Sequence, residues 1–337
     1  MLTPPPDLAE DALVACLAEH WRLETTALAY QPLGFGAHHW TATDRDGTER
    51  FLTVHDLLAK RRADDDAPDD VFRRLTASFS AAKALEVAGL GFVLAPTTTA
   101  AGAVVARVDD RFSLAVHPFL AGHPAGPEGE LTSAADRLVV LELVVEVHRA
   151  SDAARPHADV DDLEVRHREE VPAALDAIGT SWDAGPYGER ARQLLELTAA
   201  GLQQLVSAYG ELRAQVEPLL ERAVLTHGEP HASNVLVVDG RFLLIDWDTA
   251  LLAPAERDLW VLEPGDGSIL GAYERATGLE PSRPALDLYR LWYDLAEIGQ
   301  YLGELRREHG STDDMAESWR NLQHFLRPAE RWPELVG

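Results

Sequence analysis

The chain has very little cysteine. Of its 337 residues only Cys16 is a cysteine, which excludes an intramolecular disulfide and a metal cluster bound by several cysteines. Cys16 lies in a segment whose apolar residues, Leu13, Leu17 and Trp21, recur at helical spacing. We therefore interpret Cys16 as a residue that packs in the core of the protein.

Long apolar runs are also missing. No stretch of eighteen or more consecutive apolar residues occurs, and residues 1–21 contain no basic segment followed by an apolar one. The sequence thus gives no support for a membrane span or a secretory signal. We expect a cytoplasmic protein without a membrane partner.

Positive charge is scarce. The chain has 30 Lys and Arg residues against 56 Asp and Glu residues, a formal net charge of −26. A nucleic-acid backbone needs positive groups to neutralise it, so we expect no nucleic-acid partner. An acidic field would attract a cationic ligand, although acidic surfaces also serve solubility alone. A nucleotide should bind with its charge screened by Mg²⁺.

The pattern up to about residue 120 predicts a small, mainly antiparallel sheet that carries one helix. Short β-prone runs alternate there with turn residues. We expect strands at 27–32, 38–43, 50–54, 91–95, 103–108 and 112–118, a first helix at 7–22, a loop at 60–70 and the sheet's helix at 71–87. At this length the chain should form two domains or one bilobal unit.

From about residue 121 onwards helical periodicity predominates. Leu138, Leu141 and Val144 share one predicted helical face, and long helical segments extend from Pro284 to Phe325. Two apolar strands between residues 224 and 245 interrupt these helices. The order predicts an α+β fold with a β-rich N-terminal lobe, residues 1–120, and a helical C-terminal lobe, residues 121–337.

The interrupting segment sets acidic and amide groups at a spacing that phosphoryl transfer uses. Asn234 follows Glu229 by five positions, and Asp246 comes after an apolar strand, a turn and a second apolar strand. In a kinase catalytic loop one carboxylate orients the attacking hydroxyl, while an Asn and a second carboxylate hold metal against the nucleotide phosphates. Glu229, Asn234 and Asp246 are therefore candidate catalytic residues.

The segments HGEPHASNVL and LIDWDTALLAPAERDLW resemble the catalytic and metal loops of the aminoglycoside phosphotransferase family, especially its spectinomycin phosphotransferase branch. The resemblance implies a bilobal protein-kinase-like fold and a Mg²⁺-dependent enzyme of antibiotic resistance. Such an enzyme moves the γ-phosphate of ATP or GTP to a hydroxyl of an aminoglycoside, an aminocyclitol or a related, possibly cationic, small molecule.

The resemblance also implies roles for individual residues of the C-terminal lobe. Glu229 takes the place of the catalytic base, and Asn234 and Asp246 take the places of the two metal ligands. His227 should fix the catalytic loop. The segment Glu256–Asp258 matches an element that braces this loop in the family.

On the nucleotide side the resemblance implies a phosphate-covering turn, Gly34, Phe35, Gly36 and Ala37, because glycines let backbone amides approach an anion. An ordinary hairpin turn would show the same residues. Thr53 stands at the nucleotide-binding position of the third predicted strand. Pro118, Phe119 and Leu120 would form the hinge whose backbone meets the base of the nucleotide.

Two residues depart from the family pattern. Glu229 stands where the family places Asp, and one added methylene displaces the base unless the loop compensates. Thr53 stands where a phosphate-binding lysine is expected, and Thr76 stands at the position of the lysine's acidic partner. We expect another cation to substitute for the missing lysine, with Lys60, Lys83 and Arg45 as candidates.

The acceptor should be bound by acidic residues of the C-terminal lobe. Asp294 and Glu297 lie three positions apart on one predicted helical face and are the first candidates. Asp161, Asp162 and Glu164 form a second acidic segment. For each of these carboxylates a solvated surface charge is the more common role.

Two other functions remain open at this point. His227, Glu229, His231 and Asp246 include the ligand types of a metal hydrolase, but they lack the spacing of a known zinc motif. A pseudokinase, a binding or regulatory protein without phosphoryl transfer, is favoured by Thr53 and Glu229. The two predicted metal ligands argue against it.

Overall fold

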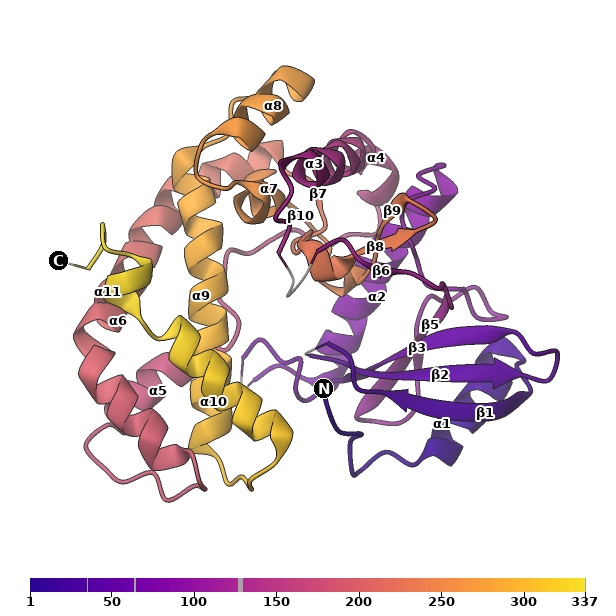
Figure 1. Ribbon diagram of the computed structural model, residues 1–337, viewed down its shortest axis with the longest axis horizontal. Coiled ribbons are helices and arrows are strands. Elements are labelled where there is room, and N and C mark those ends of the chain that lie inside the picture. Colours follow the sequence, from indigo (N-terminus) through magenta and orange to yellow (C-terminus); the bar gives the residue numbers. More distant parts are fainter. Residues whose placement is uncertain (35, 64, 127–129, 337) are drawn as a thin grey trace.

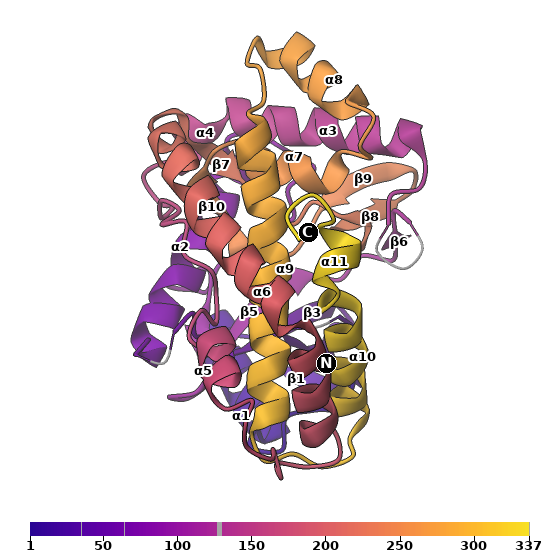
Figure 2. The same cartoon turned by 90° about the vertical axis from the view of Figure 1, so that its left-hand side faces the viewer.

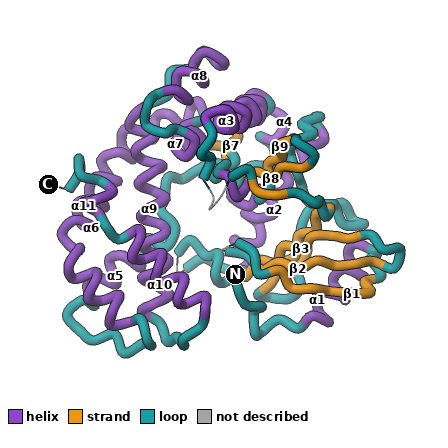
Figure 3. Tube along the Cα trace, in the orientation of Figure 1, coloured by secondary structure: helices purple, strands orange, loops and turns teal. Residues whose placement is uncertain are grey.

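The computed structural model describes residues 1–34, 36–63, 65–126 and 130–336. Its N-terminal region is built on a five-stranded sheet in the order β1-β2-β3-β5-β4, in which all neighbouring strands are antiparallel (Figures 1 and 3). The strands are β1 (Thr25–Gln31), β2 (His38–Asp44), β3 (Glu49–Asp56), β4 (Ala106–Arg107) and β5 (Phe112–Pro118).

One face of this sheet packs on the first helix, α1 (Glu10–Cys16), which a π-helical turn extends to Trp21. Side chains alternate between the two faces of a strand, and Leu52 of β3 therefore points with Trp40 into a core that includes Leu13. Cys16 is buried in the same core, as expected.

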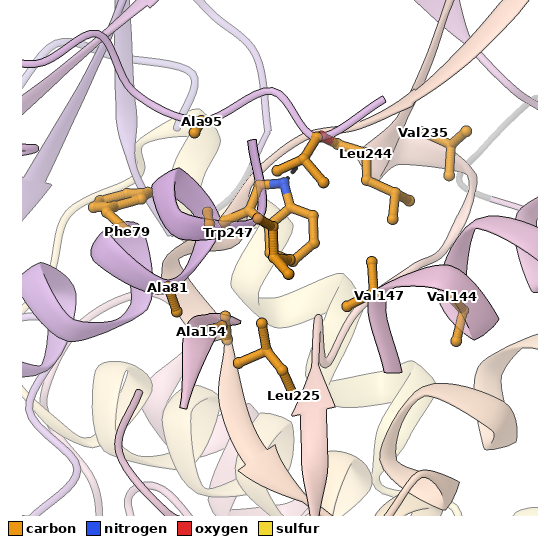
Figure 4. Close-up of a cluster of buried hydrophobic side chains, with 14 of the residues drawn as sticks. Phe79, Ala81, Ala95, Val144, Val147, Ala154, Leu225, Val235, Leu244 and Trp247 are labelled. Carbon is orange, nitrogen blue, oxygen red and sulfur yellow. Dashed lines mark hydrogen bonds between the residues drawn. The ribbon is translucent and has the colours of Figure 1, made fainter. Parts of the chain in front are cut away.

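The helix α2 (Pro68–Val87) connects the sheet to the helical region. It begins at a proline, whose missing N–H costs nothing in the first turn, and its residues Leu75, Phe79 and Leu85 are buried. Figure 4 shows Phe79 in the same buried cluster as Trp247 and Val144. Because α2 shares a core with the helical region, it fixes the sheet relative to the catalytic loops.

The C-terminal region is mainly helical (Figure 2). Its helices are α3 (Ala134–Arg149), α4 (Ser151–Ala154), α5 (Glu170–Asp176), α6 (Gly188–Val216), α7 (Glu256–Leu262), α8 (Ser268–Thr277), α9 (Arg283–Arg306), α10 (Asp313–Phe325) and α11 (Pro328–Arg331). The helix α9 lies at the centre of this region and packs against α5, α6, α7 and α10. No helix of the described residues is both long and apolar enough to cross a membrane.

Short strands position the loops of interest. They are β6 (His123–Pro124), β7 (Val224–Thr226), β8 (Val235–Val238), β9 (Arg241–Leu244) and β10 (Leu251–Ala253). A two-residue turn joins β8 to β9, and both of its residues, Asp239 and Gly240, have positive φ, as tight hairpins of this kind require. The β8–β9 hairpin holds the end of the loop after β7 next to the segment that follows β9.

Two of the predicted strands were wrong in extent. Residues 91–95 form no strand, because the segment makes only a single bridge, Val93 with Leu244 of the C-terminal region. The strand predicted at 103–108 is reduced to β4, two residues long. The other predicted strands and helices of this region match observed elements, whereas the lobe boundary at residue 120 stays a prediction.

Candidate active site

The loop between β7 and β8 places Glu229 next to Asn234. The side chain of Asn234, which is buried, donates from Nδ2 to the backbone oxygen of Glu229 at 3.0 Å. Because the nitrogen is engaged within the loop, the side-chain oxygen Oδ1 is the atom of Asn234 that can bind a cation.

His227 anchors this loop from inside. Its Nε2 donates to the backbone oxygen of Ile245 at 2.8 Å, and its Nδ1 accepts from the backbone N–H of Glu229 at 3.3 Å. Burial lowers the pKa of His227, so the ring is neutral and holds the tautomer that these two bonds need. Both ring nitrogens are therefore used to position Glu229.

Two residues at the start of α7 brace the same loop. Asp258 accepts from the backbone N–H groups of His227 at 3.0 Å and Gly228 at 2.6 Å. Gly228 has a φ of 97°, and a Cβ there would lie 2.5 Å from a nitrogen of Arg257. Glu256 does not reach the loop and instead binds Arg222 and the backbone N–H of Ser282, which corrects the expectation that the whole segment Glu256–Asp258 braces it.

Asp246 follows β9 in a left-handed conformation with φ of 63°. For a residue with a Cβ this conformation costs about 1–2 kcal/mol, a strain found mainly at functional sites. The backbone N–H of Ile245 donates to the backbone oxygen of Asn234 at 3.0 Å, which places Asp246 beside Asn234 in the chain fold. The Asp246 side chain has exposed surface. Its pKa is nevertheless raised to about 8, first because the surrounding protein removes water from the carboxylate and second because the charge of Asp248 repels it.

Asp248 lies two residues further on and is paired. Lys60, from the segment after β3, places Nζ 2.5 Å from Asp248 Oδ2. Burial alone would raise the pKa of Asp248, but Lys60 holds it at about 2. Of the three candidate cations only Lys60 contacts the catalytic segments, since Lys83 pairs with Glu86 and Arg45 with Glu24 in the described structure.

Sequence reasoning missed the partner of the candidate base. Arg166 places Nη2 3.3 Å from Glu229 Oε1, with both side chains less than a third exposed. The guanidinium of Arg166 also stacks over the ring of Trp292 on α9, 4.9 Å from its centroid. Arg166 and Glu229 are 63 positions apart in the sequence and share no motif, so the sequence did not indicate this pair.

The predicted phosphate-covering turn and the sheet positions are only partly arranged as expected. Gly34 and Gly36 have positive φ, whereas Phe35 lies outside the described residues. Ala37 is buried and precedes β2. Thr53 is buried within β3, opposite His39 of β2 and Ala115 of β5.

A cavity of about 520 Å³ lies between the sheet side and the helical side. Gly36 and Lys60 line it from one side, and Arg166, Asp248 and Trp292 line it from the other. This cavity therefore adjoins the catalytic loop without being lined by Glu229, Asn234 or Asp246.

The predicted hinge lies outside this cavity. Pro118 ends β5 and is exposed, Phe119 is exposed, and Leu120 is half-buried. None of the three lines the cavity of about 520 Å³. Their contact with a nucleotide base stays a prediction.

The structure corrects one acceptor candidate. Asp294 is 1% exposed and accepts hydrogen bonds from Arg331 and from Trp332 Nε1, so it secures the C-terminal segment and has no free oxygen for a ligand. Glu297 is half-buried and accepts from the hydroxyl of Tyr301 at 2.6 Å. Burial raises the pKa of Glu297 to about 7.

The second acidic segment is also largely paired. Asp161 is buried and accepts from the hydroxyl of Tyr289 at 3.0 Å. Asp162 pairs with Arg62 at 3.4 Å, and Glu164 pairs with Arg213 at 2.6 Å. These three carboxylates line the cavity but already have partners in the described structure.

A family model described as the phosphotransferase enzyme family matches residues 67–292. The chain belongs to this family. Protein StrN of Streptomyces griseus is 32% identical to this phosphotransferase in an alignment 253 positions long, which covers 72% of this chain and 74% of StrN.

Solved structures agree with this assignment at the level of the fold. Spectinomycin phosphotransferase in complex with ADP and spectinomycin superimposes with a TM-score of 0.73 and 18% identity, covering 98% of this chain and all of the other. An amicoumacin kinase in complex with AMP-PNP, Ca²⁺ and amicoumacin gives a TM-score of 0.55 and 13% identity, covering 95% and 93% of the two chains. The fold of this phosphotransferase is therefore the kinase-like fold predicted from its sequence.

The metal-hydrolase hypothesis finds no support in the described part of this phosphotransferase. No group of three or more His, Cys, Asp or Glu side chains there is arranged to hold a metal ion. His227, which that hypothesis needs, has both ring nitrogens in hydrogen bonds within the catalytic loop.

Proposed function

We propose that this phosphotransferase moves the γ-phosphate of ATP or GTP to a hydroxyl of a small, antibiotic-like molecule such as an aminoglycoside, an aminocyclitol or a related compound. The observation that supports the proposal is that the loop before β8, which carries Glu229 and Asn234, is hydrogen-bonded to the segment after β9, which carries Asp246. Spectinomycin phosphotransferase, a structural neighbour, binds ADP and spectinomycin, which supports the donor and acceptor classes. The acidic charge of the chain favours a cationic acceptor.

The donor set suits Mg²⁺, which prefers oxygen ligands. Asn234 keeps its Oδ1 available because Nδ2 is bonded inside the loop. Loss of hydration within the surrounding protein, and then the charge of Asp248, raise the pKa of Asp246, and Lys60 offsets them only in part. A bound cation would supply the remaining positive charge. When bound, Mg²⁺ would neutralise the phosphate oxygens and bring them into line with the acceptor.

The chain's own residues then perform the proton transfer. We assign to Glu229 the tasks of orienting the acceptor hydroxyl and accepting its proton at Oε2, since Oε1 is held by Arg166. His227 and Asp258 keep the loop in place while this happens. The turn that includes Gly34 and Gly36 is proposed to close over the phosphates, and the N-terminal lobe is proposed to bind the nucleotide.

Incubation with Mg²⁺, ATP or GTP and a panel of antibiotics and aminocyclitols tests this proposal. Mass spectrometry should detect an acceptor that gains one phosphate, together with loss of nucleotide. Asp246→Asn should abolish both product formation and Mg²⁺-dependent nucleotide binding, whereas Glu229→Gln should abolish only product formation. Nucleotide binding without a phosphorylated product from any acceptor would favour a pseudokinase.

A further inference from the structure

The sheet face at the position of the missing lysine carries histidines. Thr53 shares this face with His39, its partner in register, and with His55, whose ring lies 5.6 Å from that of Phe79 on α2. Burial lowers the pKa of His39 to about 4, of His55 to about 3 and of His117 to about 4. These imidazoles are therefore neutral at neutral pH and supply no positive charge for a phosphate chain.

Lys60 brings a positive charge to the cleft by another route. The chain has two lysines, and the other, Lys83, pairs with a glutamate one turn along α2. Lys60 follows β3 on a turn in which its backbone N–H donates to the oxygen of Asp56 at 3.0 Å. Its side chain reaches Asp248, two residues beyond the proposed metal ligand Asp246. The end of β3 therefore delivers a cation to the metal loop, as the lysine within β3 would in a kinase.

Next to Lys60, Arg61 adds a hydrogen-bond donor that has no partner among the described residues. Its buried Nε has no hydrogen-bond partner, and no ion pair holds its guanidinium, among the described residues. Arg61 lines the cavity of about 520 Å³ together with Lys60, Gly36 and Asp248. This volume lies within the range of small-molecule sites, about 300–1,000 Å³. A buried donor without a partner is costly unless a ligand completes it.

We propose that Lys60 and Arg61 together hold the phosphate chain of the nucleoside triphosphate and replace the lysine that is absent from β3. Lys60 contributes a point charge that is shared between Asp248 and a phosphate oxygen. Arg61 contributes its planar set of N–H groups, which suits the paired oxygens of a phosphate. This inference rests on the proposed function and names the residues that would bind the donor substrate.

Calorimetric titration of the full chain tests the inference. Wild type, Lys60→Met and Arg61→Met are each titrated with the Mg²⁺ complex of a non-hydrolysable ATP or GTP analogue and, separately, with the corresponding nucleoside. Loss of one charge-assisted contact should weaken binding of the triphosphate about tenfold to a hundredfold and leave binding of the nucleoside unchanged. Lys83→Met is the matched control and should bind both as the wild type does.

Two features keep the test decisive. Lys60→Met leaves Asp248 without its lysine counter-ion and should lose stability, whereas Arg61→Met removes no bond to another described residue and should melt as the wild type does. Unchanged triphosphate affinity in both variants, or an equal loss for the nucleoside, overturns the inference while the proposed function stands. Absence of nucleotide binding by the wild type overturns both together.

Discussion

Replacement of Arg166 by methionine should lower turnover without unfolding the protein. The pair of Arg166 and Glu229 joins side chains that are 30% and 24% exposed, at 3.3 Å, so its loss should cost at most about 1 kcal/mol of folding free energy. Loss of the pair should have a larger effect on the rate of phosphoryl transfer than on folding. A carboxylate that shifts by about 1 Å at a reacting centre can cost about a hundredfold in rate, and the extra methylene of Glu229 allows such a shift once Oε1 is released.

The assay is steady-state kinetics with a phosphorylatable acceptor, combined with thermal melting. Arg166→Met should lower kcat by about tenfold to a hundredfold, with the KM for nucleotide unchanged. Arg213→Met, which breaks the pair with Glu164 in the neighbouring acidic segment, is the matched control and should keep normal kcat.

A double variant separates positioning of the base from other roles of Arg166. In a Glu229→Gln background, Arg166→Met should have no further effect on the residual rate, because the carboxylate that Arg166 holds is already gone. A full additional loss of rate in that background, or a normal kcat in the single variant, would show that Arg166 does not act by positioning Glu229.

The remaining predictions concern the loop, the core and pH. Gly228→Ala should abolish turnover, because its Cβ would lie 2.5 Å from a guanidinium nitrogen, whereas Gly240→Ala, also at positive φ but with open space around it, should lose only about 1 kcal/mol and stay active. Asp294→Ala should cost about 3–5 kcal/mol in urea unfolding, because it leaves a guanidinium without its buried partner, while Asp287→Ala, in an exposed pair, should cost less than about 1 kcal/mol. Glu297 has a folded-state pKa of about 7, above its usual value, so its contribution to stability is present in acid and is lost as pH rises through about 7. Glu297→Gln should therefore raise the melting temperature relative to wild type at pH 8 but not at pH 4, and an equal difference at both pH values would contradict this assignment.

The elements that the sequence predicted well are those set by local pattern. The strand at 112–118 coincides with β5, and the β8–β9 hairpin follows from two apolar runs around Asp239 and Gly240. The run 91–95 has the same apolar character, but it pairs through a single bridge, which periodicity does not reveal. Local patterns therefore predicted the type of element more reliably than the partner of each element.

The contacts that define the site are set by tertiary packing. Lys60 and Asp248 are 188 residues apart, and their pairing depends on how α2 holds the sheet against the metal loop. Sequence spacing placed Asp294 and Glu297 on one helical face, yet only the fold reveals that Asp294 is used by the C-terminal segment. Glu229 and Asn234 were predictable because five residues of one loop fix their separation.

In the proposed reaction, Glu229, Asn234 and Asp246 hold a cation-bound triphosphate beside an acceptor hydroxyl. The most direct test is a structure of Glu229→Gln soaked with Mg²⁺ and a non-hydrolysable triphosphate analogue. We expect the metal within about 2.0–2.1 Å of Asn234 Oδ1 and an Asp246 oxygen, with the terminal phosphate on the side of residue 229. Metal and phosphates bound away from Asn234 and Asp246 would contradict it.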